Sequence, residues 1–588
     1  MFGRRKRDLF NQIVDRIRQR SLSWSSRFLS TAGKTTMLKA VLASMPTYTM
    51  SCFKLPVSLY KRIQSALTRF WWDSSAGQKK MCWIAWSKMT KSKQDGGLGF
   101  KDISNFNDAL LAKVSWRILK NPSCLLAKTL LGKYCRTSSF LDCPTRNSAS
   151  HGWKGICLGR DLIKSQLGRS IGSGADTLIW NAPWISLSAS VTPMGPPTHE
   201  TQFMTVKDLI CPISKTWNRE KITTYLPHYQ SEIFQLRPSR FGARGKFIWI
   251  PTKSGEYSTR TGYYAAEALQ RLHRDAPPQP VTFNWNSEIW KKKCSPKIKF
   301  LLWKALKNAL PLGANLKARG INPTAACPYC SAEESGLHLF FLCPFAAQIW
   351  EQAPFKNTLS TFTFTNLQRG FEAAKHLICL PPVGLGPFPL FPWLIWSIWT
   401  CRNKKVFEQK HLSSRDVISQ AIVAAKEWFL AQPLPQGIQT LPPSPFEPVV
   451  ESDAILCFTD AAWREDSLEA GLGWIFVDNS NHSEIQDHAV AREVSSPLMA
   501  EAIALFSAIQ QASNRGFKKL VVASDSQQLV EAILRELHPK ELQGILHDIL
   551  FISLNFVAIS FQFVKRENNC KADAVAKAAL LAINSVPV

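Results

Sequence analysis

The chain contains, at residues 454–460, the apolar run Ala454-Ile-Leu-Cys-Phe-Thr-Asp460, which ends on a carboxylate. Apolar residues fill both alternating sets of positions, as in a strand that is buried on both faces in the middle of a sheet. A second apolar run, Leu520-Val-Val-Ala-Ser-Asp525, ends in the same way. One Asp at a strand end is usually a turn or cap residue, but two such ends can direct both carboxylates into one cleft.

Two further carboxylates lie in helical patterns. Glu501 belongs to the stretch Pro497–Phe506, where apolar residues recur with helical periodicity. Asp573 opens the last helical stretch, where the helix dipole alone would favour an acid. Four carboxylates in one cleft with no fixed cation require divalent metal. Two hard cations about 4 Å apart are a standard device for the attack of water on a phosphodiester.

The order and spacing of these acids resemble the ribonuclease H family, type 1. The motifs that carry the resemblance are FTDAAW at 458–463, AEAIAL at 500–505, ASDS at 523–526 and VKRENNCKADAVAK at 564–577, and it covers about residues 452–582. The resemblance implies an α/β fold with an α+β mixed sheet. The expected elements are strands near 454–460, 471–478 and 484–494, the Glu501 helix, the strand ending at Asp525, two short helices, a strand near 556–565 and a final helix.

The same resemblance implies a reaction, the cleavage of the RNA strand of an RNA–DNA hybrid with two Mg²⁺ ions. Asp460 is expected to bridge the two ions. Glu501 and Asp525 would complete one metal site, and Asp573 the other. The products would carry 5′-phosphate and 3′-hydroxyl ends.

Two residues are candidates for substrate binding, and two departures from the family affect activity. Asn569 matches a family Asn near the scissile phosphate. Arg566 lies in the loop before the last acid, where cellular members of the family often carry a His. The loop before the last acid is shorter than in cellular relatives. The stretch 536–548 is not basic, whereas those relatives carry a basic protrusion that grips hybrid. The alternative is therefore a nucleic-acid-binding remnant with an idle nuclease domain.

A second group of metal-ligating residues lies in the middle of the chain. It comprises Cys327, Cys330, His338 and Cys343, with the spacing C-x2-C-x7-H-x4-C. Three sulfurs and one nitrogen with no open position are typical of a structural zinc site. The alternative is a set of unpaired cysteines with an unrelated histidine. We expect one Zn²⁺ here without a catalytic role.

The sequence around this group resembles the zinc-binding domain that follows the polymerase in plant LINE-type (non-LTR) retroelement polyproteins. Residues 295–321 carry this resemblance. Upstream, the stretches 29–55, 70–72, 96–100, 106–122 and 171–185 resemble the segment just after the polymerase core of the same elements. The Arg402-Asn403 pair resembles part of the family's helix between the zinc and nuclease domains. Before residue 450 there is no paired-aspartate motif of a reverse transcriptase. We therefore expect the polymerase core to be absent and the chain to correspond to the C-terminal part of such a polyprotein. A truncated element, a fragment and a gene reused by its host all fit this pattern.

Charge is distributed unevenly along the 588 residues, whose net charge is +29. Residues 1–150 hold about 27 Lys and Arg against about 7 Asp and Glu, whereas residues 451–588 hold about 11 against about 18. A basic body attached to an acidic nuclease-like region indicates a polyanionic partner, RNA, DNA or their hybrid. A merely soluble basic surface is the alternative.

Targeting and membrane signals are weak. The N-terminus lacks an apolar signal segment, and Gly3–Arg7 resembles a nuclear import signal, so we expect a nuclear protein, with the cytoplasm as the alternative. Residues 377–401 carry no charge, but their five prolines prevent a continuous membrane helix. We expect an aromatic helix near 393–409 packed in a soluble core, and no membrane partner.

These observations predict a multidomain protein that is mostly α before the ribonuclease H-like domain. The expected segments are a basic helical region at 1–150, a connection region with short strands at 151–280, a zinc-binding domain at 281–365, a helical region at 366–431, a proline-rich linker at 432–450 and the ribonuclease H-like domain at 451–588.

Overall fold

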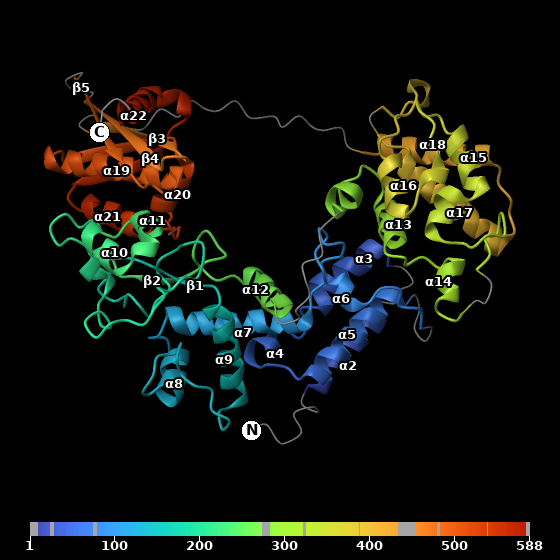
Figure 1. Cartoon of the computed structure of the whole chain (residues 1–588), viewed down its shortest axis with the longest axis horizontal. Helices are drawn as coiled ribbons and strands as arrows, with labels where there is room; N and C mark the ends of the chain where they lie inside the picture. Colours follow the sequence, from blue (N-terminus) through green and yellow to red (C-terminus); the bar gives the residue numbers. More distant parts are fainter. Residues whose placement is uncertain are drawn as a thin grey trace. The chain divides into compact units, whose positions relative to one another are not determined.

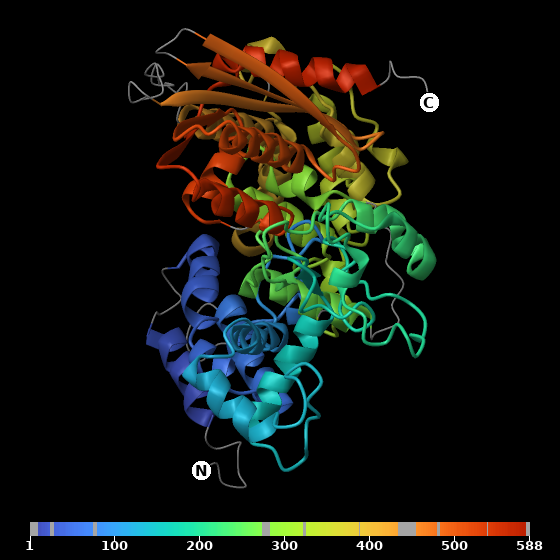
Figure 2. The ribbon, with the colours of Figure 1, turned by 90° about the vertical axis from the view of Figure 1, so that its left-hand side faces the viewer.

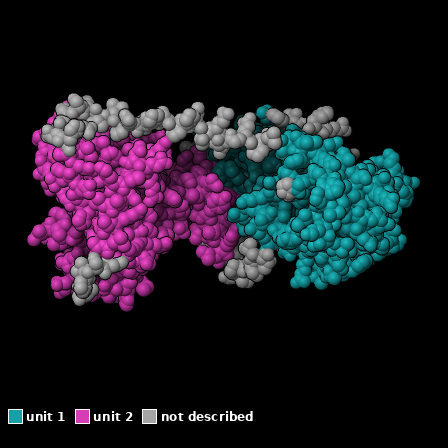
Figure 3. Space-filling view, turned by 90° about the horizontal axis from the view of Figure 1, so that it is seen from above, with its two compact units in different colours: residues 1–50, 55–106, 274–439 teal, residues 51–54, 107–273, 440–588 magenta. Residues whose placement is uncertain are grey.

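The computed structural model describes residues 10–23, 29–73, 79–272, 283–321, 325–386, 388–432, 454–478, 483–537 and 539–583. The basic run 3–7 lies outside these ranges, as does the predicted linker apart from Gln432. The chain forms two compact units, each built from several stretches (Figure 3). Unit 1 comprises residues 1–50, 55–106 and 274–439, and unit 2 comprises residues 51–54, 107–273 and 440–588. The domain boundaries expected from the sequence stay predictions, because a compact unit can combine several sequence segments.

The first part of unit 1 is helical, as the sequence predicted. Its helices are α2 (Asn11–Ser23), α3 (Thr31–Thr36), η1 (Met37–Leu42), α4 (Thr47–Cys52), which runs into unit 2, α5 (Val57–Trp72) and α6 (Trp86–Met89). Helix α5 forms because its apolar residues recur at helical spacing, so that Leu59, Ile63 and Leu67 are buried on one stripe. The aromatic motif at 70–72 ends this helix, and its three rings are buried.

The second part of unit 1 holds the cysteine group. Its helices are η4 (Asn286–Trp290), α13 (Pro296–Leu306), α14 (Gly313–Lys317), η5 (His338–Leu342), α15 (Pro344–Gln352), η6 (Thr361–Thr363), α16 (Leu367–Ala374), η7 (Pro381–Val383), α17 (Phe391–Glu408) and α18 (Ser414–Leu430). Helix α17 confirms the predicted aromatic helix, with Trp393, Leu394 and Ile398 buried. Among the described residues, no helix combines the length and the apolarity needed to cross a bilayer.

Residues 107–273 of unit 2 make a mixed region of helices and short strands. Its elements are α7 (Ile103–Lys120), which begins in unit 1, α8 (Leu125–Tyr134), α9 (His151–Lys164), β1 (Leu167–Ser170), η2 (Val206–Leu209), α10 (Arg219–Tyr225), η3 (Pro227–Tyr229), α11 (Gln230–Phe234), β2 (Lys246–Trp249) and α12 (Thr259–Leu272). Strands β1 and β2 pair antiparallel as a two-stranded ribbon. Helices α10 and α11 and this ribbon lie beside the C-terminal part of unit 2 (Figure 1).

The C-terminal part of unit 2 is a five-stranded mixed sheet in the order β5-β4-β3-β6-β7. The strands are β3 (Ile455–Arg464), β4 (Glu469–Asp478), β5 (Ser483–Ala491), β6 (Lys519–Ser524) and β7 (Ala558–Phe563). Strands β3, β4 and β5 run antiparallel, whereas β6 and β7 continue parallel to β3. The apolar run at residues 454–460 therefore lies in the central strand β3, as its two-sided pattern predicted.

Helices cover both faces of this sheet. Helices α19 (Pro497–Asn514), α20 (Gln527–Leu534) and α21 (Gln543–Ser553) share one apolar core with the sheet. The final helix α22 (Cys570–Ala582) packs on the opposite face, above the sheet in Figure 2, where α19 and α21 lie below it. A Cβ atom added at Gly473 of β4 would lie 2.6 Å from the backbone nitrogen of Ala576, so glycine is required for α22 to approach this closely. This approach sets the position of Asp573 on α22.

Candidate active site and metal centre

Three of the four predicted carboxylates meet where the pairing of β3 with β6 ends. The sequence predicted a strand end at Asp460, whereas β3 continues to Arg464 through its pairing with β4. Thr459 and Ser524 are partners in the parallel register, so the next residues, Asp460 and Asp525, lie side by side. Glu501 reaches the same place from the first half of α19. One carboxylate oxygen from each of these three residues lies within 4.8 Å of the others.

Electrostatic repulsion in this group is strong. Burial raises the pKa of the Asp460 carboxyl to about 7, and the charges of Asp525 and Asp573 act in the same direction. Burial also raises the pKa of Glu501 to about 9, with the charge of Asp460 adding to it. Among the described residues, Oε2 of Glu501 is buried with no hydrogen-bond partner. Clustered carboxylates with an unpaired buried oxygen form a donor set that suits a divalent cation.

The fourth carboxylate, Asp573, lies close enough to Asp460 to influence its pKa but is bound by cations. Its oxygens accept a hydrogen bond from Nζ of Lys577 at 2.6 Å and lie 3.6 Å from a guanidinium nitrogen of Arg566. Burial pushes the pKa of Asp573 upward, but these two cations outweigh burial, so the pKa is lower than usual. Asp573 is therefore ionised and already paired.

The two predicted substrate-binding residues have different surroundings. Asn569 is 1% exposed, and its Nδ2 donates a hydrogen bond to the carbonyl oxygen of Thr459 at 3.0 Å. This bond ties the start of α22 to the residue before Asp460, which gives Asn569 a positioning contact. Arg566 is largely exposed and lines the cleft above the acids. A role for either residue in binding substrate stays a prediction.

The acids open into a cleft of about 760 Å³. One wall is formed by the ribonuclease H-like region itself, including Asp460, Glu501 and Asp525. The other wall comes from residues 107–273 and was not predicted from the sequence. It is lined by residues 185–188, Glu232, Gln235, Leu236 and Lys253, and no motif in those stretches indicates it.

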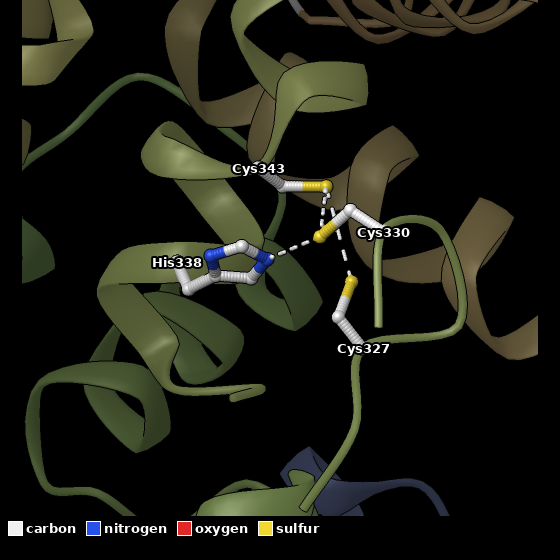
Figure 4. Close-up of side chains that lie close together, drawn as sticks. All are labelled: Cys327, Cys330, His338 and Cys343. Atoms are coloured by element: carbon white, nitrogen blue, oxygen red, sulfur yellow. Dashed lines mark hydrogen bonds between the residues drawn. The ribbon is translucent and has the colours of Figure 1, made fainter. Parts of the chain in front are cut away.

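The predicted zinc ligands form a compact group in unit 1 (Figure 4). Sγ of Cys343 lies 3.8 Å from Sγ of Cys327 and 4.0 Å from Sγ of Cys330, and Nε2 of His338 lies 3.1 Å from the latter sulfur. A tetrahedral zinc with Zn–S bonds of about 2.3 Å holds its sulfurs about 3.8 Å apart, so these residues fit the ion. The hydrogen bond between Cys343 and Cys327 lowers the pKa of Cys327 to about 5 and raises the pKa of Cys343, so the pair holds one of the thiolates that zinc needs.

Local structure explains how His338 and Cys343 face the same side. They stand at the two ends of the π-helical turn η5, and the backbone N–H of Cys343 donates to the carbonyl of His338 at 2.8 Å. A hydrogen bond between residues five apart is the mark of a π-turn, and it brings an H-x4-C pair together.

The helical region after the zinc group locks the Cys-x-x-Cys loop in place. Arg402 of α17 makes two charge-assisted hydrogen bonds to Glu334, at 2.7 and 2.6 Å, and both side chains are buried. The hydroxyl of Tyr329, inside the loop, lies 3.1 Å from Sγ of Cys401. The Arg402-Asn403 pair noted in the sequence thus has a structural role beside the zinc group.

Comparisons with known proteins agree with the two regions. A family model described as reverse transcriptase-like matches residues 458–579, and a model described as zinc-binding in reverse transcriptase matches residues 261–350. A protein of Arabidopsis thaliana named "Putative ribonuclease H protein" is 29% identical over 416 residues, which cover 68% of this chain and 64% of that protein. The chain therefore spans less than two thirds of that relative.

A second relative from Arabidopsis thaliana, an uncharacterized mitochondrial protein, is 43% identical over 153 residues, 26% of this chain and 99% of that protein. Among solved structures, ribonuclease H1 from Halobacterium salinarum is 23% identical, with a TM-score of 0.21 over 22% of this chain and 97% of its own. LC11-RNase H1 in complex with an RNA/DNA hybrid is 23% identical, with a TM-score of 0.20 over 21% of this chain and 95% of its own. With a reverse-transcriptase zinc-binding domain followed by a ribonuclease H-like domain, the chain belongs to the retroelement reverse transcriptase family and corresponds to its C-terminal part.

Proposed function

We propose that the protein cleaves the RNA strand of RNA–DNA hybrids by metal-assisted hydrolysis. The observation that supports this most is the group of three carboxylate oxygens within 4.8 Å at the floor of an open cleft. Asp460, Glu501 and Asp525 would hold one Mg²⁺, and Asp460 with Asp573 a second. Bound magnesium supplies an activated water and stabilises the leaving 3′ oxygen.

The chain's own residues prepare this chemistry by their protonation. Burial keeps a proton on Glu501 while no cation is near, because its pKa is raised to about 9. Loading the site must release that proton. Asp573, in contrast, is ionised but held by Lys577, so this ammonium must move aside before the carboxylate can take another partner.

Nucleic-acid binding is assigned chiefly to the basic N-terminal half. In unit 1, the ammonium groups of Lys39, Lys93 and Lys307 lie over the rings of Phe100, Trp290 and Trp285, respectively. Among the described residues, none of these three lysines pairs with a carboxylate. Burial lowers the pKa of Lys39 and Lys307, and neighbouring lysines lower it further. Lysines that repel one another beside aromatic rings suit a partner with phosphates and stacked bases.

A second function is favoured by one observation, the capture of Asp573 by Lys577 and Arg566. If these cations keep the fourth carboxylate occupied, the domain folds and binds nucleic acid but does not cut. In either case we propose that the chain carries no polymerase chemistry, that the zinc is structural and that the protein acts in the nucleus.

The deciding experiment compares a labelled RNA–DNA hybrid with RNA and DNA duplexes, with and without Mg²⁺, using the full-length chain and Asp460→Asn. Cutting of RNA in the hybrid alone, dependent on Mg²⁺ and lost in the variant, supports the nuclease. Tight binding of the hybrid without cutting, in Mg²⁺ and in Mn²⁺, supports the idle domain. Cutting that survives in Asp460→Asn contradicts the proposed site.

A further inference from the structure

The cleft over the three acids has a wall that does not belong to the ribonuclease H-like domain. The wall consists of residues 185–188, of Glu232, Gln235 and Leu236 around the end of α11, and of Lys253 after β2. It lines a cleft of about 760 Å³ together with Asp460 and Glu501. All of these residues belong to unit 2.

A buried carboxylate fixes this wall to the domain. Asp548 of α21 is 3% exposed. It accepts a hydrogen bond from the hydroxyl of Ser239 at 2.5 Å, and others from the backbone N–H groups of Arg240 and Phe241 at 2.8 and 3.2 Å. Every one of these donors belongs to the connection region. A buried anion whose hydrogen-bond donors all come from a distant segment marks a specific contact between the two.

Apolar and close contacts surround this carboxylate. The ring of Phe241 stacks on Phe551 of α21, with the centroids 4.9 Å apart. The hydroxyl of Ser170 on β1 donates to Oε1 of Gln543 at 2.5 Å. A Cβ atom added at Gly544 would lie 2.8 Å from the carbonyl oxygen of Arg237, so α21 packs directly against backbone. The contact is therefore tight along the first half of the helix.

The connection region also contacts the stretch just before α21. In this stretch Lys540 donates from its backbone nitrogen to the carbonyl of Lys253 at 3.1 Å, and from Nζ to the carbonyl of Ile250 at 2.7 Å. These bonds hold residues 250–253 at the rim of the cleft. The side chain of Lys253 stays exposed, and among the described residues no carboxylate pairs with it.

We propose that residues 185–188 and Lys253 form a wall that contacts nucleic acid across the cleft from the three acids. The inference rests on the proposed function, since it names the surface that positions the strand to be cut. The ammonium of Lys253 and the hydroxyls of Ser186 and Ser188 suit phosphate oxygens of the backbone. Leu187, which is half-buried, offers apolar contact to a sugar. Glu232 lines the same wall and accepts a hydrogen bond from Ser231.

Kinetic measurements on the full-length protein test the role of Lys253 in binding nucleic acid. Lys253→Ala should raise KM for a short RNA–DNA hybrid severalfold with little change in kcat. It should also reduce the slope of log affinity against log salt by about one, the value for one lost phosphate contact. Lys207→Ala is the matched control, because Lys207 is an exposed lysine of the same region that does not line the cleft. Equal KM and equal salt slopes for Lys253→Ala, Lys207→Ala and wild type would overturn the proposal.

A second measurement works even if the protein proves unable to cut. A photo-crosslinking residue replaces Leu187 or, as the control, Lys207, and each protein is irradiated with labelled hybrid. Crosslinking at 187 and not at 207 supports the wall, whatever the activity. Absence of crosslinking at 187, in protein that still binds hybrid, overturns it. A rise in cutting rate for Lys253→Ala would also overturn it, because the wall would then act as a lid.

Discussion

The two metal-ligating groups of this protein are built in opposite ways. The zinc group draws its four ligands from 17 consecutive residues, Cys327 to Cys343, and each sulfur finds another ligand atom as a neighbour. The carboxylate group draws its members from the middle of β3, the residue after β6 and two helices, and its buried oxygens repel one another. The first is a closed set that one soft cation satisfies. The second is open to a cleft, and the free protein holds it together against electrostatic repulsion.

We infer from this difference that the zinc site maintains the local fold, whereas the carboxylate site is maintained by the fold around it. Removing metal from the zinc group should undo local structure, because three thiol groups and an imidazole would then pack together without the cation that satisfies them. Removing metal from the acids should leave the fold intact, because the sheet and α22 hold Asp460 and Asp573 without help. Substitutions at each site test the two halves of this contrast.

Loss of zinc should have the largest effect. Cys343→Ser, or chelation of wild type, should remove one zinc per chain and unfold the segment around 325–352. Structural zinc sites contribute about 10–16 kcal/mol in small peptides. Elemental analysis and hydrogen exchange would measure this, with Cys52→Ser as the control, since Cys52 is an exposed free thiol. Unchanged exchange protection in the zinc-free protein would contradict a structural role.

Asp460→Asn comes next. We expect hybrid cutting to fall more than a hundredfold, because a shared ligand is lost from both magnesium sites, and even outer residues cost about 10- to 100-fold. Thermal stability should stay the same or rise, because the substitution removes a charge from a repelling group. Calorimetry and a cleavage assay on one preparation would show both. A stability loss as large as the activity loss would mean that Asp460 is structural.

The docking carboxylate should have an intermediate effect. Asp548→Ala leaves the hydroxyl of Ser239 and two backbone N–H groups without their acceptor. Stranding buried donors costs about 1–3 kcal/mol, so the melting temperature of unit 2 should fall by a few degrees. Asp466→Ala, an exposed turn residue, is the control. Equal melting temperatures for the two variants would show that the docking contact is weak.

The pH dependence of stability should be a smaller effect than the loss of Asp548, and it should report the ionisation of Glu501. Its pKa in the folded, metal-free protein is about 9, above the usual value of 4.5. The folded state therefore keeps a proton that the unfolded state loses above pH 4.5. Stability should fall as pH rises between these values. Glu501→Gln should flatten the curve, and so should Mg²⁺ in wild type. If metal-free wild type and Glu501→Gln showed the same slope of stability against pH, Glu501 would not be the group responsible.

The smallest effect concerns Lys577. If its ammonium competes with metal for Asp573, Lys577→Ala should lower the Mg²⁺ concentration for half-maximal cutting by a fewfold. Lys571→Ala is the control, because Lys571 lies on the same helix but pairs with Glu484. A variant that cuts while wild type does not would establish the idle-domain alternative for the natural sequence and identify its cause.

The sequence predicted the part of the molecule that depends on local pattern. The two-sided apolar run at 454–460 placed the central strand, and the spacing of Cys327, Cys330, His338 and Cys343 anticipated the group that the structure assembles. The ion pair between Lys577 and Asp573 was not predicted, although a separation of four residues on a helix favours such a pair. The docking of Asp548 on Ser239 had no such signal, because a single acid and a single serine 309 residues apart carry no pattern.

That separation has a consequence for how the protein is made. A ribosome adds about 5–20 residues per second, so Ser239 and Phe241 emerge roughly 15–60 s before Asp548. During that interval the apolar surface around Phe241 has no cover and is open to wrong partners. We expect nascent chains paused between these points to recruit chaperones. A gene copy interrupted before α21 would leave that surface uncovered for the life of its product.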